Sequence, residues 1–590
     1  MQIDVPNDPS SPKMADALTV TIGQINPTVG DIQGNVAQIL RVAAEAPPAA
    51  LVVFPELSLC GYYPGDLLLQ PHFMSAVRTG LLSLIEANRS AGGQYWVIGA
   101  PAINPGQGKP FLNQLIVLHK GQIVLSYSKQ LLPTYDIFDE ARHFEPGPDT
   151  AALLRVGRLR VGFVVCEDAW ARVPEDESAS LYRTDPLQRL ADAHPDLVVS
   201  INASPAAAGK RERRHDLFAL AARRIGAPVL YVNQVGGQDQ TVFDGASFLM
   251  NTWGRVEAEA LAYAADVVSI KVSPSQESCV PASAIENVAQ ANARTPMETY
   301  RQQIVLGLRD YAQRCGFCQV VVGSSGGIDS ALTLALAVEA MGAANVVAIT
   351  MPSEYSSTGS VSDSEALCAN LGVKLLSHPI RALVDQYKAG FAESTGNPLC
   401  GVALENLQAR IRGTILMEYS NSFGHLLLTT GNKSEMAVGY CTLYGDTNGG
   451  LNLIGDLYKT EVFELSRHLN EQAGQELIPV QIIEKAPSAE LAPGQQDSDS
   501  LPEYPVLDSL LKELIEGSGM QASDRMLVRQ VKQGFSSEAW GVLQTKIAGL
   551  MARSEYKRRQ APPVIKLRAV SFGPGRQVPI AAKHILGGAL

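Results

Sequence analysis

The sequence predicts an α/β protein with two layered domains, and three observations support this prediction. Short apolar runs typical of buried strands alternate with longer stretches typical of helices along most of the chain. The second half repeats the alternation so regularly that a parallel, doubly wound sheet is favoured. A loop-like stretch that begins at Ser273 separates the halves. We therefore expect domains at residues 17–272 and 296–590, joined by a linker at 273–295.

Composition limits the possible functions. The chain has 590 residues and is 46% hydrophobic, which is enough for large cores in more than one domain. Its net charge of −11 argues against nucleic acid as the main partner. No uninterrupted apolar run reaches the roughly 18 residues of a membrane-spanning helix. Residues 1–16 are polar and acidic where a signal peptide would be basic, so we expect a disordered lead, a start at Met1 or Met14, and a cytoplasmic protein.

The eight cysteines are scattered and show no disulfide framework. Cys315 and Cys318 form one CxxC pair, but zinc sites of this type need a second pair. We interpret the pair as small residues that precede a buried strand.

The first domain is predicted from alternating strands and helices. A helix is expected to begin at Gly30-Asp31, and another covers 212–224. The predicted strands cover residues 18–25, 50–54, 95–99, 115–119, 123–126, 159–165, 196–201 and 228–233.

Three reactive side chains lie at or near the ends of these strands, where the active sites of α/β proteins gather. They are Glu56 in FPEL, Lys129 in YSKQLLP and Cys166 in VVCEDAW. A cysteine nucleophile needs a base to remove its proton and a cation to stabilise the developing oxyanion. Glu56 can act as the base and Lys129 as the cation. The alternatives are a buried structural cysteine and a solvated loop lysine.

These residues resemble the Glu-Lys-Cys triad of the nitrilase superfamily, and the stretches FPEL, SKQLLPTYDIFDEARHF, CEDAW and NASP extend the resemblance over most of the domain. It implies an α-β-β-α sandwich. The closer resemblance is to the glutaminase domain of the glutamine-dependent NAD synthetases. It implies that Tyr135, Ser204 and Lys210 hold glutamine, although Arg211 is an alternative to Lys210. We expect residues 204–210 to form a flexible loop. The alternative for Lys210 and Arg211 is that they form the charged start of a helix.

Residues 320–331, VVVGSSGGIDSA, are predicted to form a strand, a glycine-rich loop and the start of a helix. Backbone N–H groups at such a helix N-terminus can hold phosphate, and Gly326 and Gly327 allow the close approach of an anion. Asp329 would repel phosphate, so we expect it to hold a divalent cation. The lysine of a Walker A loop is absent. An ordinary Gly/Ser-rich turn is the alternative.

The second domain continues the alternation. The predicted strands cover residues 319–322, 345–350, 373–378 and 425–429, and the predicted helices cover 296–315, 331–341, 361–371 and 403–423. In a doubly wound sheet, ligands bind at the carboxyl ends of the strands. The loop 323–330, Met351 and Thr430 all fall at that edge.

The glycine loop resembles the SGGxDS loop of the ATP pyrophosphatases, which cleave ATP between the α and β phosphates and adenylate a substrate. This resemblance implies a Rossmann-like fold. Together with the NAD synthetase resemblance described next, it implies that ATP is held by Gly323, Ser324, Ser325, Gly326, Gly327, Ile328, Asp329, Ser330, Met351, Thr430, Lys459 and Ser488.

Three later stretches resemble NAD synthetases more than GMP or asparagine synthetases: ALENLQARIRGTILMEYSN, LLTTGNKSEMAVGYCTLYGDTNGGLNLIGDLYKTEV and KAPSAELAPGQQDSDSLPEYPVLD. The third is predicted to be a loop that closes over the active site. The resemblance implies that Asn406, Glu435 and Lys557 contact deamido-NAD. Two carboxylates from separate segments suit Mg²⁺, so Asp329 and Glu435 are the expected ligands.

Some positions fit the pattern less clearly. Leu443 stands where the ammonia-using synthetases carry a lysine. Arg410 and Arg412 lie on the predicted helix 403–423, where a solvated face is the alternative interpretation. A solvated surface run is also the alternative for residues 557–559.

Taken together, the resemblances cover about 95% of the chain and predict an ATP-dependent amidation. Glutamine supplies ammonia, deamido-NAD is adenylated and amidated to NAD, and AMP, pyrophosphate and glutamate are released. Mg²⁺ is the expected cofactor, the partners are small molecules, and we expect a homo-oligomer through the synthetase domains. Two alternatives are another glutamine amidotransferase with an adenylated acceptor and a nucleotide-binding sensor fused to a carbon–nitrogen hydrolase.

Overall fold

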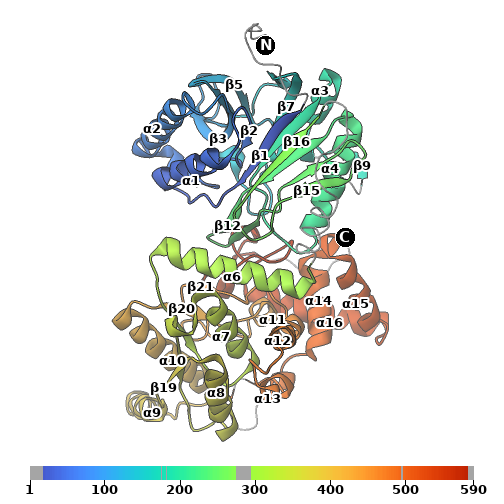
Figure 1. The fold of residues 1–590 in the computed structure, drawn as a ribbon. Coiled ribbons are helices and arrows are strands. Elements are labelled where there is room, and N and C mark those ends of the chain that lie inside the picture. Colours follow the sequence, from blue (N-terminus) through green and yellow to red (C-terminus); the bar gives the residue numbers. More distant parts are fainter. Residues whose placement is uncertain are drawn as a thin grey trace. The chain divides into compact units, whose positions relative to one another are not determined.

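The computed structural model describes residues 17–173, 176–180, 182–273, 294–488, 490–492 and 496–582. The expected lead at 1–16 and almost all of the expected linker lie outside these residues. The chain divides into two compact units, one formed by Met1–Gln238 with Val242–Arg294 and the other by Asp239–Thr241 with Thr295–Leu590. Figure 1 shows the elements of both units. Among the described helices, none combines the length and the apolar character needed to cross a membrane.

The first unit is an α-β-β-α sandwich, which confirms the predicted fold class. Its two six-stranded sheets have the orders β16-β1-β2-β3-β4-β5 and β15-β14-β11-β10-β7-β6. Their inner faces share one apolar core, in which Val20 and Ile22 of one sheet join Val161 and Phe163 of the other. Helices α1 and α2 pack on the first sheet, and α3 and α4 on the second.

The elements of this half of the chain are β1 (Leu18–Gln24), α1 (Ile32–Glu45), β2 (Leu51–Val53), η1 (Gly65–Leu69), α2 (Pro71–Asn88), β3 (Tyr95–Ile103), β4 (Phe111–His119), β5 (Gln122–Ser128), η2 (Glu140–Arg142), β6 (Ala152–Val156), β7 (Leu159–Val165), η3 (Cys166–Trp170), β8 (Arg172–Val173), β9 (Asp176–Ser180), α3 (Pro186–Ala193), β10 (Leu197–Asn202), α4 (Lys210–Ile225), β11 (Val229–Asn233), β12 (Val235–Gln238), β13 (Thr241–Asp244), β14 (Phe248–Met250), β15 (Val256–Glu259) and β16 (Asp266–Val272).

Local sequence explains most of these boundaries. Asp31 caps α1 by accepting a hydrogen bond from Gly34 N at 2.9 Å, as the predicted helix start requires. Strand β3 runs four residues beyond the predicted end at Gly99, because it pairs with β4 as far as Ile103. Gly99 is a packing glycine rather than a strand end, since a Cβ there would lie 2.2 Å from the backbone nitrogen of Leu57.

The second unit contains a parallel five-stranded sheet in the order β19-β18-β17-β20-β21, which confirms the predicted doubly wound arrangement. Strands β18 and β19 follow β17 on one side of it, and β20 and β21 lie on its other side. The carboxyl ends of β17 and β20 are therefore the topological switch point, where such sheets bind ligands. Helices α9 and α10 cover one face, and α7 contacts β17 and β18.

Helix α7 is buried on nearly every side, because α6 and α12 pack against it as well. A separate apolar cluster joins α11, α14 and α16 and includes Met436, Leu507, Trp540 and Phe572. The predicted helix at 296–315 is confirmed as α6, which begins after a Thr295 cap and ends at Gly316.

The elements of this half are α6 (Pro296–Cys315), β17 (Val320–Gly323), α7 (Ile328–Met341), η4 (Ala343–Asn345), β18 (Val346–Thr350), α8 (Thr358–Leu371), β19 (Lys374–Ser377), α9 (Arg381–Thr395), α10 (Val402–Phe423), β20 (Leu426–Thr429), α11 (Lys433–Val438), β21 (Leu451–Asn452), α12 (Lys459–Ala473), α13 (Val480–Glu484), η5 (Asp497–Asp499), α14 (Tyr504–Ile515), η6 (Gly517–Gly519), α15 (Ala522–Lys532), α16 (Ser537–Arg553) and α17 (Glu555–Arg558).

Candidate active sites

The first candidate site lies at the strand ends of the sandwich. Glu56 follows β2, Lys129 follows β5 and Cys166 follows β7, and all three side chains are buried. Lys129 Nζ lies 2.7 Å from Glu56 Oε1. Cys166 has a φ of +46°, a left-handed conformation that costs energy for a non-glycine residue and often marks a functional turn.

Electrostatics keep the Cys166 thiol protonated at rest. Burial raises its pKa well above the usual range, the charge of Glu56 raises it further, and the Lys129 ammonium opposes both. A buried neutral thiol is a poor nucleophile, so the site needs a base close to the sulfur. Three donors fix the position of the Glu56 carboxylate, the expected base: Lys129 Nζ, Asn113 Nδ2 at 2.7 Å and Ala203 N at 3.1 Å.

A second carboxylate, Glu140, is part of this cluster although the sequence analysis did not single it out. Its Oε1 accepts hydrogen bonds from Lys129 Nζ and from the Tyr62 hydroxyl, each at 2.7 Å. Burial raises the pKa of Glu140 to about 7, and Lys129 opposes this rise. Burial would also lower the pKa of Lys129, but the two carboxylates raise it well above its usual value. Lys129 is therefore charged and fixed between two acceptors.

Asp168 was also missed, and it holds the two strand ends together. Its carboxylate accepts hydrogen bonds from Gln130 N at 3.0 Å and Leu131 N at 2.9 Å after β5. It also accepts one from Val165 N at 3.1 Å at the end of β7. Because Lys129 precedes Gln130 and Cys166 follows Val165, this buried carboxylate sets their relative position. Neither acidic residue has a sequence signal beyond lying in a stretch that matches the family.

Two of the residues expected to hold glutamine, Tyr135 and Lys210, lie close to Cys166. Tyr135 donates its hydroxyl to Glu167, the residue after the cysteine, at 3.0 Å. Lys210 begins α4, and its Nζ lies 4.3 Å from the centre of the Trp170 ring. Burial and the nearby charge of Arg214 lower the pKa of Lys210 to about 8, and the charge of Glu167 opposes this.

Arg211, the alternative to Lys210, is occupied elsewhere, because it makes two hydrogen bonds to Glu259 at 2.9 and 2.7 Å. Ser204 and Ala206 lie in the segment expected to be a flexible loop, but both are buried. Ala206 N donates to Val242 O at 2.7 Å, and Arg214 Nε donates to Ser204 Oγ at 3.1 Å.

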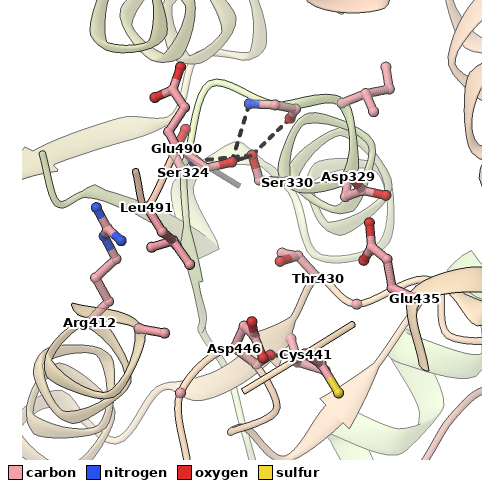
Figure 2. A pocket seen from close by; sticks show the side chains of 18 of the residues that line it. Ser324, Asp329, Ser330, Arg412, Thr430, Glu435, Cys441, Asp446, Glu490 and Leu491 are labelled. Atoms are coloured by element: carbon pink, nitrogen blue, oxygen red, sulfur yellow. Dashed lines mark hydrogen bonds between the residues drawn. The ribbon is translucent and has the colours of Figure 1, made fainter. Parts of the chain in front are cut away.

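The second candidate site is a pocket of about 300 Å³ at the switch point of the parallel sheet. Figure 2 shows Ser324, Asp329 and Ser330 facing Thr430 and Glu435 across it, with Arg412 to one side. Of the predicted residues, its wall includes Gly323, Ser324, Ser325, Gly327, Ile328, Asp329, Ser330, Met351, Thr430, Glu435, Lys459 and Ser488.

The glycine loop packs closely against α8, at a position that only glycine can occupy. Gly326 has a φ of +76°, and a Cβ there would lie 2.3 Å from the carbonyl oxygen of Ser360. The Ser330 hydroxyl donates to Gly327 O at 3.0 Å and accepts from Ser325 N at 3.2 Å, so the loop is closed onto the first turn of α7. The N-terminus of α7 is therefore a suitable anion site.

Two carboxylates share one lysine in this pocket. Lys459 Nζ lies 2.5 Å from Asp329 Oδ2 and 3.1 Å from Glu435 Oε1. Burial raises the pKa of Glu435 to about 7; the Lys459 charge lowers it and the Asp329 charge raises it. Burial lowers the pKa of Lys459, but both carboxylates raise it more, so its ammonium is retained. Asn432 links the two acids, because its amide donates to Asp329 at 2.9 Å and its oxygen accepts from Glu435 N at 3.0 Å.

These oxygen donors fit a magnesium ion that takes its remaining ligands from water and substrate phosphates. Within the described residues, no group of three or more His, Cys, Asp or Glu side chains forms a metal site made by protein alone. Cys315 and Cys318 are exposed free thiols.

Asn406 and Lys557 are not among the described residues that line the pocket, but both contact the segment 439–442. Thr442 donates to Asn406 Oδ1 at 2.8 Å, and Lys557 Nζ donates to the carbonyls of Gly439 and Cys441 at 2.8 and 2.7 Å. Cys441 lines the pocket, so Lys557 lies behind its wall, whereas Asn406 contacts the adjacent residue Thr442.

Other pocket residues were assigned no specific role in the sequence analysis. Arg412 lines the pocket and donates from Nε to Met351 O at 3.0 Å, so it is not part of a solvated face. Burial lowers its pKa to about 10, and Glu490 opposes this. Glu490 and Asp497 come from the stretch predicted to close over the site, where only Ser488 had been singled out. Acidic residues in a Pro/Ser/Asp-rich loop carry no periodic signal that would separate them from solvated ones.

Comparisons with known proteins match both halves of the chain. The carbon-nitrogen hydrolase family matches residues 19–278, and the NAD synthase family matches residues 300–561. The glutamine-dependent NAD(+) synthetase of Synechocystis sp. is 42% identical over 574 residues, which is 95% of this chain and 98% of the relative. The enzyme of the same name from Rhodobacter capsulatus is 38% identical and covers 96% of this chain and 99% of its own.

Two solved structures are similar over nearly the whole chain. A glutamine-dependent NAD+ synthetase from Acinetobacter baumannii, in complex with ADP, is 34% identical with a TM-score of 0.71 and covers 96% of this chain and 98% of its own. A synthetase from Cytophaga hutchinsonii is 19% identical with a TM-score of 0.77 and the same coverage, which supports the fold alone. This chain belongs to the glutamine-dependent NAD(+) synthetase family.

Proposed function

We propose that this enzyme converts deamido-NAD to NAD with ammonia from glutamine, consuming ATP and releasing AMP, pyrophosphate and glutamate. The observation that carries the proposal is the family match, because it spans a buried Glu-Lys-Cys cluster and a phosphate-type loop in a single chain. Either site alone would fit several classes of enzyme, whereas the pair fits an amidotransferase.

The first site would release ammonia. Glu56 takes the proton of Cys166, and the thiolate attacks the carboxamide carbon of glutamine. The Lys129 ammonium, held between Glu56 and Glu140, stabilises the oxyanion of the tetrahedral intermediate. The proton on Glu56 passes to the leaving nitrogen, and ammonia departs. Water, activated by Glu56, then hydrolyses the thioester to glutamate.

Glutamine recognition would come from the polar groups around Cys166. We assign its α-carboxylate to Lys210, because Arg211 is already paired with Glu259. Tyr135 and Ser204 complete the pocket, and Glu167 orients the Tyr135 hydroxyl.

The second site would activate and amidate deamido-NAD. ATP lies on residues 323–330, with Met351, Thr430, Lys459 and Ser488 around it. The nicotinate carboxylate attacks the α-phosphorus, pyrophosphate leaves, and ammonia then attacks the acyl carbon and displaces AMP. Positioning and charge neutralisation provide most of the catalysis in such steps, and the Lys459 ammonium is the protein's own cation here.

Asp329 and Glu435 are the residues that would hold Mg²⁺, which neutralises phosphate charge when it is bound. Asn406, Glu435 and Lys557 are assigned to deamido-NAD. Glu435 is assigned both to Mg²⁺ and to deamido-NAD, so its carboxylate would lie between the nucleotide and the dinucleotide.

We also propose a homo-oligomer formed through the synthetase half. Leu383, Tyr387 and Phe391 recur every four residues on α9 and are all exposed, which is an unusual apolar stripe for a free surface. The described cysteines are free thiols, which suits the reducing cytoplasm as the proposed compartment.

One assay tests the function and separates the alternatives. Enzyme, ATP, Mg²⁺, glutamine and deamido-NAD are mixed, and AMP, pyrophosphate, glutamate and NAD are measured. A different amidotransferase would form AMP only with another acceptor, and a sensor would form none.

Two variants then assign the sites. Cys166→Ala should lose glutamine-dependent synthesis and keep ammonia-dependent synthesis. Loss of both activities in this variant would contradict the assignment of glutamine hydrolysis and amidation to separate sites.

Asp329→Ala should lose synthesis with either nitrogen source, while its Cys166 still releases glutamate from glutamine.

A further inference from the structure

Helix α14 carries a polar stripe, buried over most of its length, that neither proposed half-reaction uses. Tyr504, Asp508 and Lys512 recur every four residues in a helix that is otherwise largely apolar. Asp508 and Lys512 are each only 2% exposed. A buried charge is costly unless it is paired and hydrogen-bonded, so the partners of Asp508 and Lys512 indicate what the stripe does.

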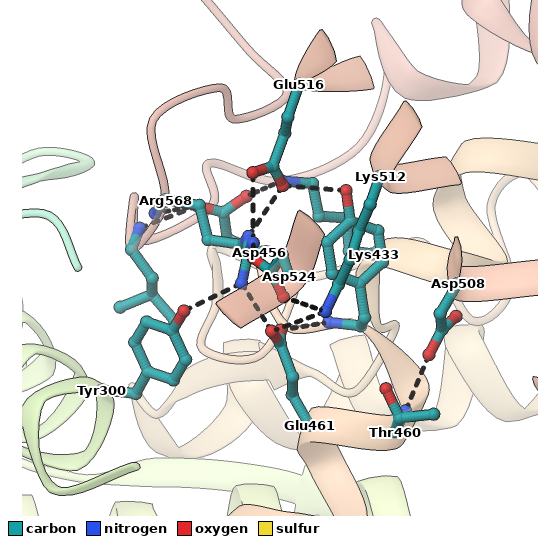
Figure 3. A network of polar contacts seen from close by, with 12 residues as sticks. Tyr300, Lys433, Asp456, Thr460, Glu461, Asp508, Lys512, Glu516, Asp524 and Arg568 are labelled. Atoms are coloured by element: carbon teal, nitrogen blue, oxygen red, sulfur yellow. Dashed lines mark hydrogen bonds and ion pairs between the residues drawn. The ribbon is translucent and has the colours of Figure 1, made fainter. Parts of the chain in front are cut away.

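Asp508 uses both of its carboxylate oxygens. Oδ1 accepts a hydrogen bond from the Ser434 hydroxyl at 2.5 Å, and Oδ2 accepts one from Thr460 N at 2.9 Å. The Ser434 hydroxyl oxygen in turn accepts a hydrogen bond from Lys459 N at 3.0 Å. Figure 3 shows Asp508 reaching the start of α12 at Thr460. Burial raises the pKa of Asp508 to about 6, while the bonds from Ser434 and Thr460 lower it, so the group is ionised at neutral pH.

These contacts flank the charged residues of the second site. Ser434 directly precedes Glu435, and Thr460 directly follows Lys459. Asp508 therefore joins the first turn of α11 to the first turn of α12, the two helices that carry Glu435 and Lys459. One turn earlier on α14, the Tyr504 ring lies beneath Lys459, with Nζ 5.3 Å from the ring centre.

The remainder of the network holds α14 in place. Lys512 pairs with Asp524 at 2.5 Å and with Glu461 at 3.5 Å. Arg568 pairs with Glu461, Glu516 and Asp524, so α12, α14 and α15 meet at one buried arginine. Figure 3 shows this arrangement around Glu461. Asp508 is therefore a hydrogen-bond acceptor in a fixed position, because these ion pairs hold α14 in place.

We propose that Asp508 is a positioning residue for NAD synthesis, which through Ser434 and Thr460 fixes the Lys459 ammonium between Asp329 and Glu435. The inference rests on the proposed function of that site. Phosphoryl chemistry depends on placement, and a shift of about 1 Å can cost about a hundredfold in rate. Nothing in the arrangement brings Asp508 itself to a substrate, because its two oxygens are occupied by protein donors.

The test uses the full-length enzyme with ammonia as the nitrogen source. Asp508→Asn keeps the size of the side chain but presents a donor where one of two acceptors stood. Ser434→Ala removes the bridge and leaves the carboxylate. Ser466→Ala is the matched control, because Ser466 is a buried serine on α12 whose hydroxyl donates only to Val462 O at 2.7 Å among the described contacts.

We expect kcat to fall about tenfold to a hundredfold in Asp508→Asn and Ser434→Ala, with KM for ATP and deamido-NAD within about twofold. The double variant should be no slower than the slower single variant, because both act through one chain of contacts. Glutamate release from glutamine should be unchanged in all variants. Ser466→Ala should keep the wild-type kcat, even where its melting temperature falls as much as that of Ser434→Ala.

The proposal is overturned if both single variants keep kcat within about twofold of wild type, or if their effects on kcat multiply in the double variant. It is also overturned if Ser466→Ala slows synthesis as much as Ser434→Ala, since the loss would then follow from general destabilisation. If Asp508→Asn does not fold, Ser434→Ala and its control decide the matter. Lys459→Ala separates failure of the proposed site from failure of the positioning role. Full NAD synthesis in Lys459→Ala would refute the site itself. Loss of synthesis in Lys459→Ala, together with normal synthesis in Asp508→Asn, would refute only the positioning role of Asp508.

Discussion

At the scale of single residues, Lys129 shows how the first site solves an electrostatic problem. A lysine that is 1% exposed would ordinarily lose its proton. Here Glu56 and Glu140 each lie 2.7 Å from its Nζ and keep it charged. Burial is the main reason that the pKa of the Cys166 thiol is raised, and the same arrangement adds to it by leaving one more carboxylate than ammonium close to the sulfur. In the mechanism that we propose, the reaction therefore begins with proton transfer from Cys166 to Glu56.

Lys210 carries a prediction about pH. Its pKa is lowered by burial to about 8, below the ordinary value for lysine, so its ammonium is present below that pH and is lost as pH rises through it. If Lys210 holds the glutamine carboxylate, KM for glutamine should rise roughly tenfold as the charge is lost, since a hydrogen bond to a charged group contributes about 1.5–3 kcal/mol. The measurement is glutamate release as a function of glutamine concentration, from about pH 7 to about pH 9.5.

The control for this prediction is Lys210→Arg. Arginine stays protonated over the whole range, so KM for glutamine should then change far less with pH. The variant also accounts for ionisation of glutamine itself, which affects both enzymes equally. A wild-type KM that is flat across the range would show that Lys210 does not bind the carboxylate.

The residues of the first site differ in how far sequence could identify them. Glu56, Lys129 and Cys166 each follow a recognisable strand, and their chemistry suggests a role. Glu140 and Asp168 were not found, because their importance lies in contacts with residues that are distant in sequence. Glu140 meets Lys129 and Tyr62 only after the strands have paired. A carboxylate in a short loop looks like a solvated one until the fold buries it.

At the scale of elements, the alternation of strands and helices was predictable and the strand ends were less so. Helix α6 was predicted at its observed bounds because Pro296 and Gly316 mark both ends. Strand β3 was predicted too short, because Gly99 resembles a strand breaker until the Leu57 backbone is seen against it. The switch point between β17 and β20 followed from the order of parallel strands, a property that sequence carries only indirectly.

The glycine loop between β17 and α7 carries a prediction of its own. Gly326→Ala should impair ATP use, because the new Cβ would lie 2.3 Å from Ser360 O and force the loop away from α8. We expect kcat/KM for ATP to fall by about a hundredfold, as a displaced phosphate site would produce. The measurement is ammonia-dependent NAD formation at varied ATP, together with a thermal melt.

Gly424→Ala is the matched control. Gly424 has a similar φ of +69°, but no neighbouring atom lies within 4 Å of the position that a Cβ would take. Both variants lose about 1–2 kcal/mol for the left-handed conformation, so only the steric clash differs. Equal losses of kcat/KM in the two variants would mean that the close approach of Gly326 to Ser360 has no part in ATP binding.

At the scale of the whole molecule, each unit carries its own cluster of charged residues for the step that we assign to it. The Glu56, Lys129 and Glu140 cluster draws all its contacts from the first unit, and the Asp329, Lys459 and Glu435 cluster draws its contacts from the second. If the proposed division of labour holds, this separation allows ammonia to replace glutamine as a test substrate. It also means that a variant in one cluster can be judged against the intact activity of the other.

The apolar stripe on α9 leads to the last prediction. Leu383, Tyr387 and Phe391 are 36%, 60% and 39% exposed, and a contiguous apolar stripe of this kind favours burial against a second chain. Tyr387→Glu places a charge in its middle, and desolvating that charge would oppose assembly. We expect the wild-type enzyme to sediment as a homo-oligomer and Tyr387→Glu to sediment as a smaller species. Val542→Glu changes an apolar residue on α16 that is similarly exposed, at 65%, and should leave the wild-type species unchanged. Sedimentation velocity at matched concentrations measures all three, and an unchanged sedimentation coefficient for Tyr387→Glu would show that α9 is not the contact between subunits.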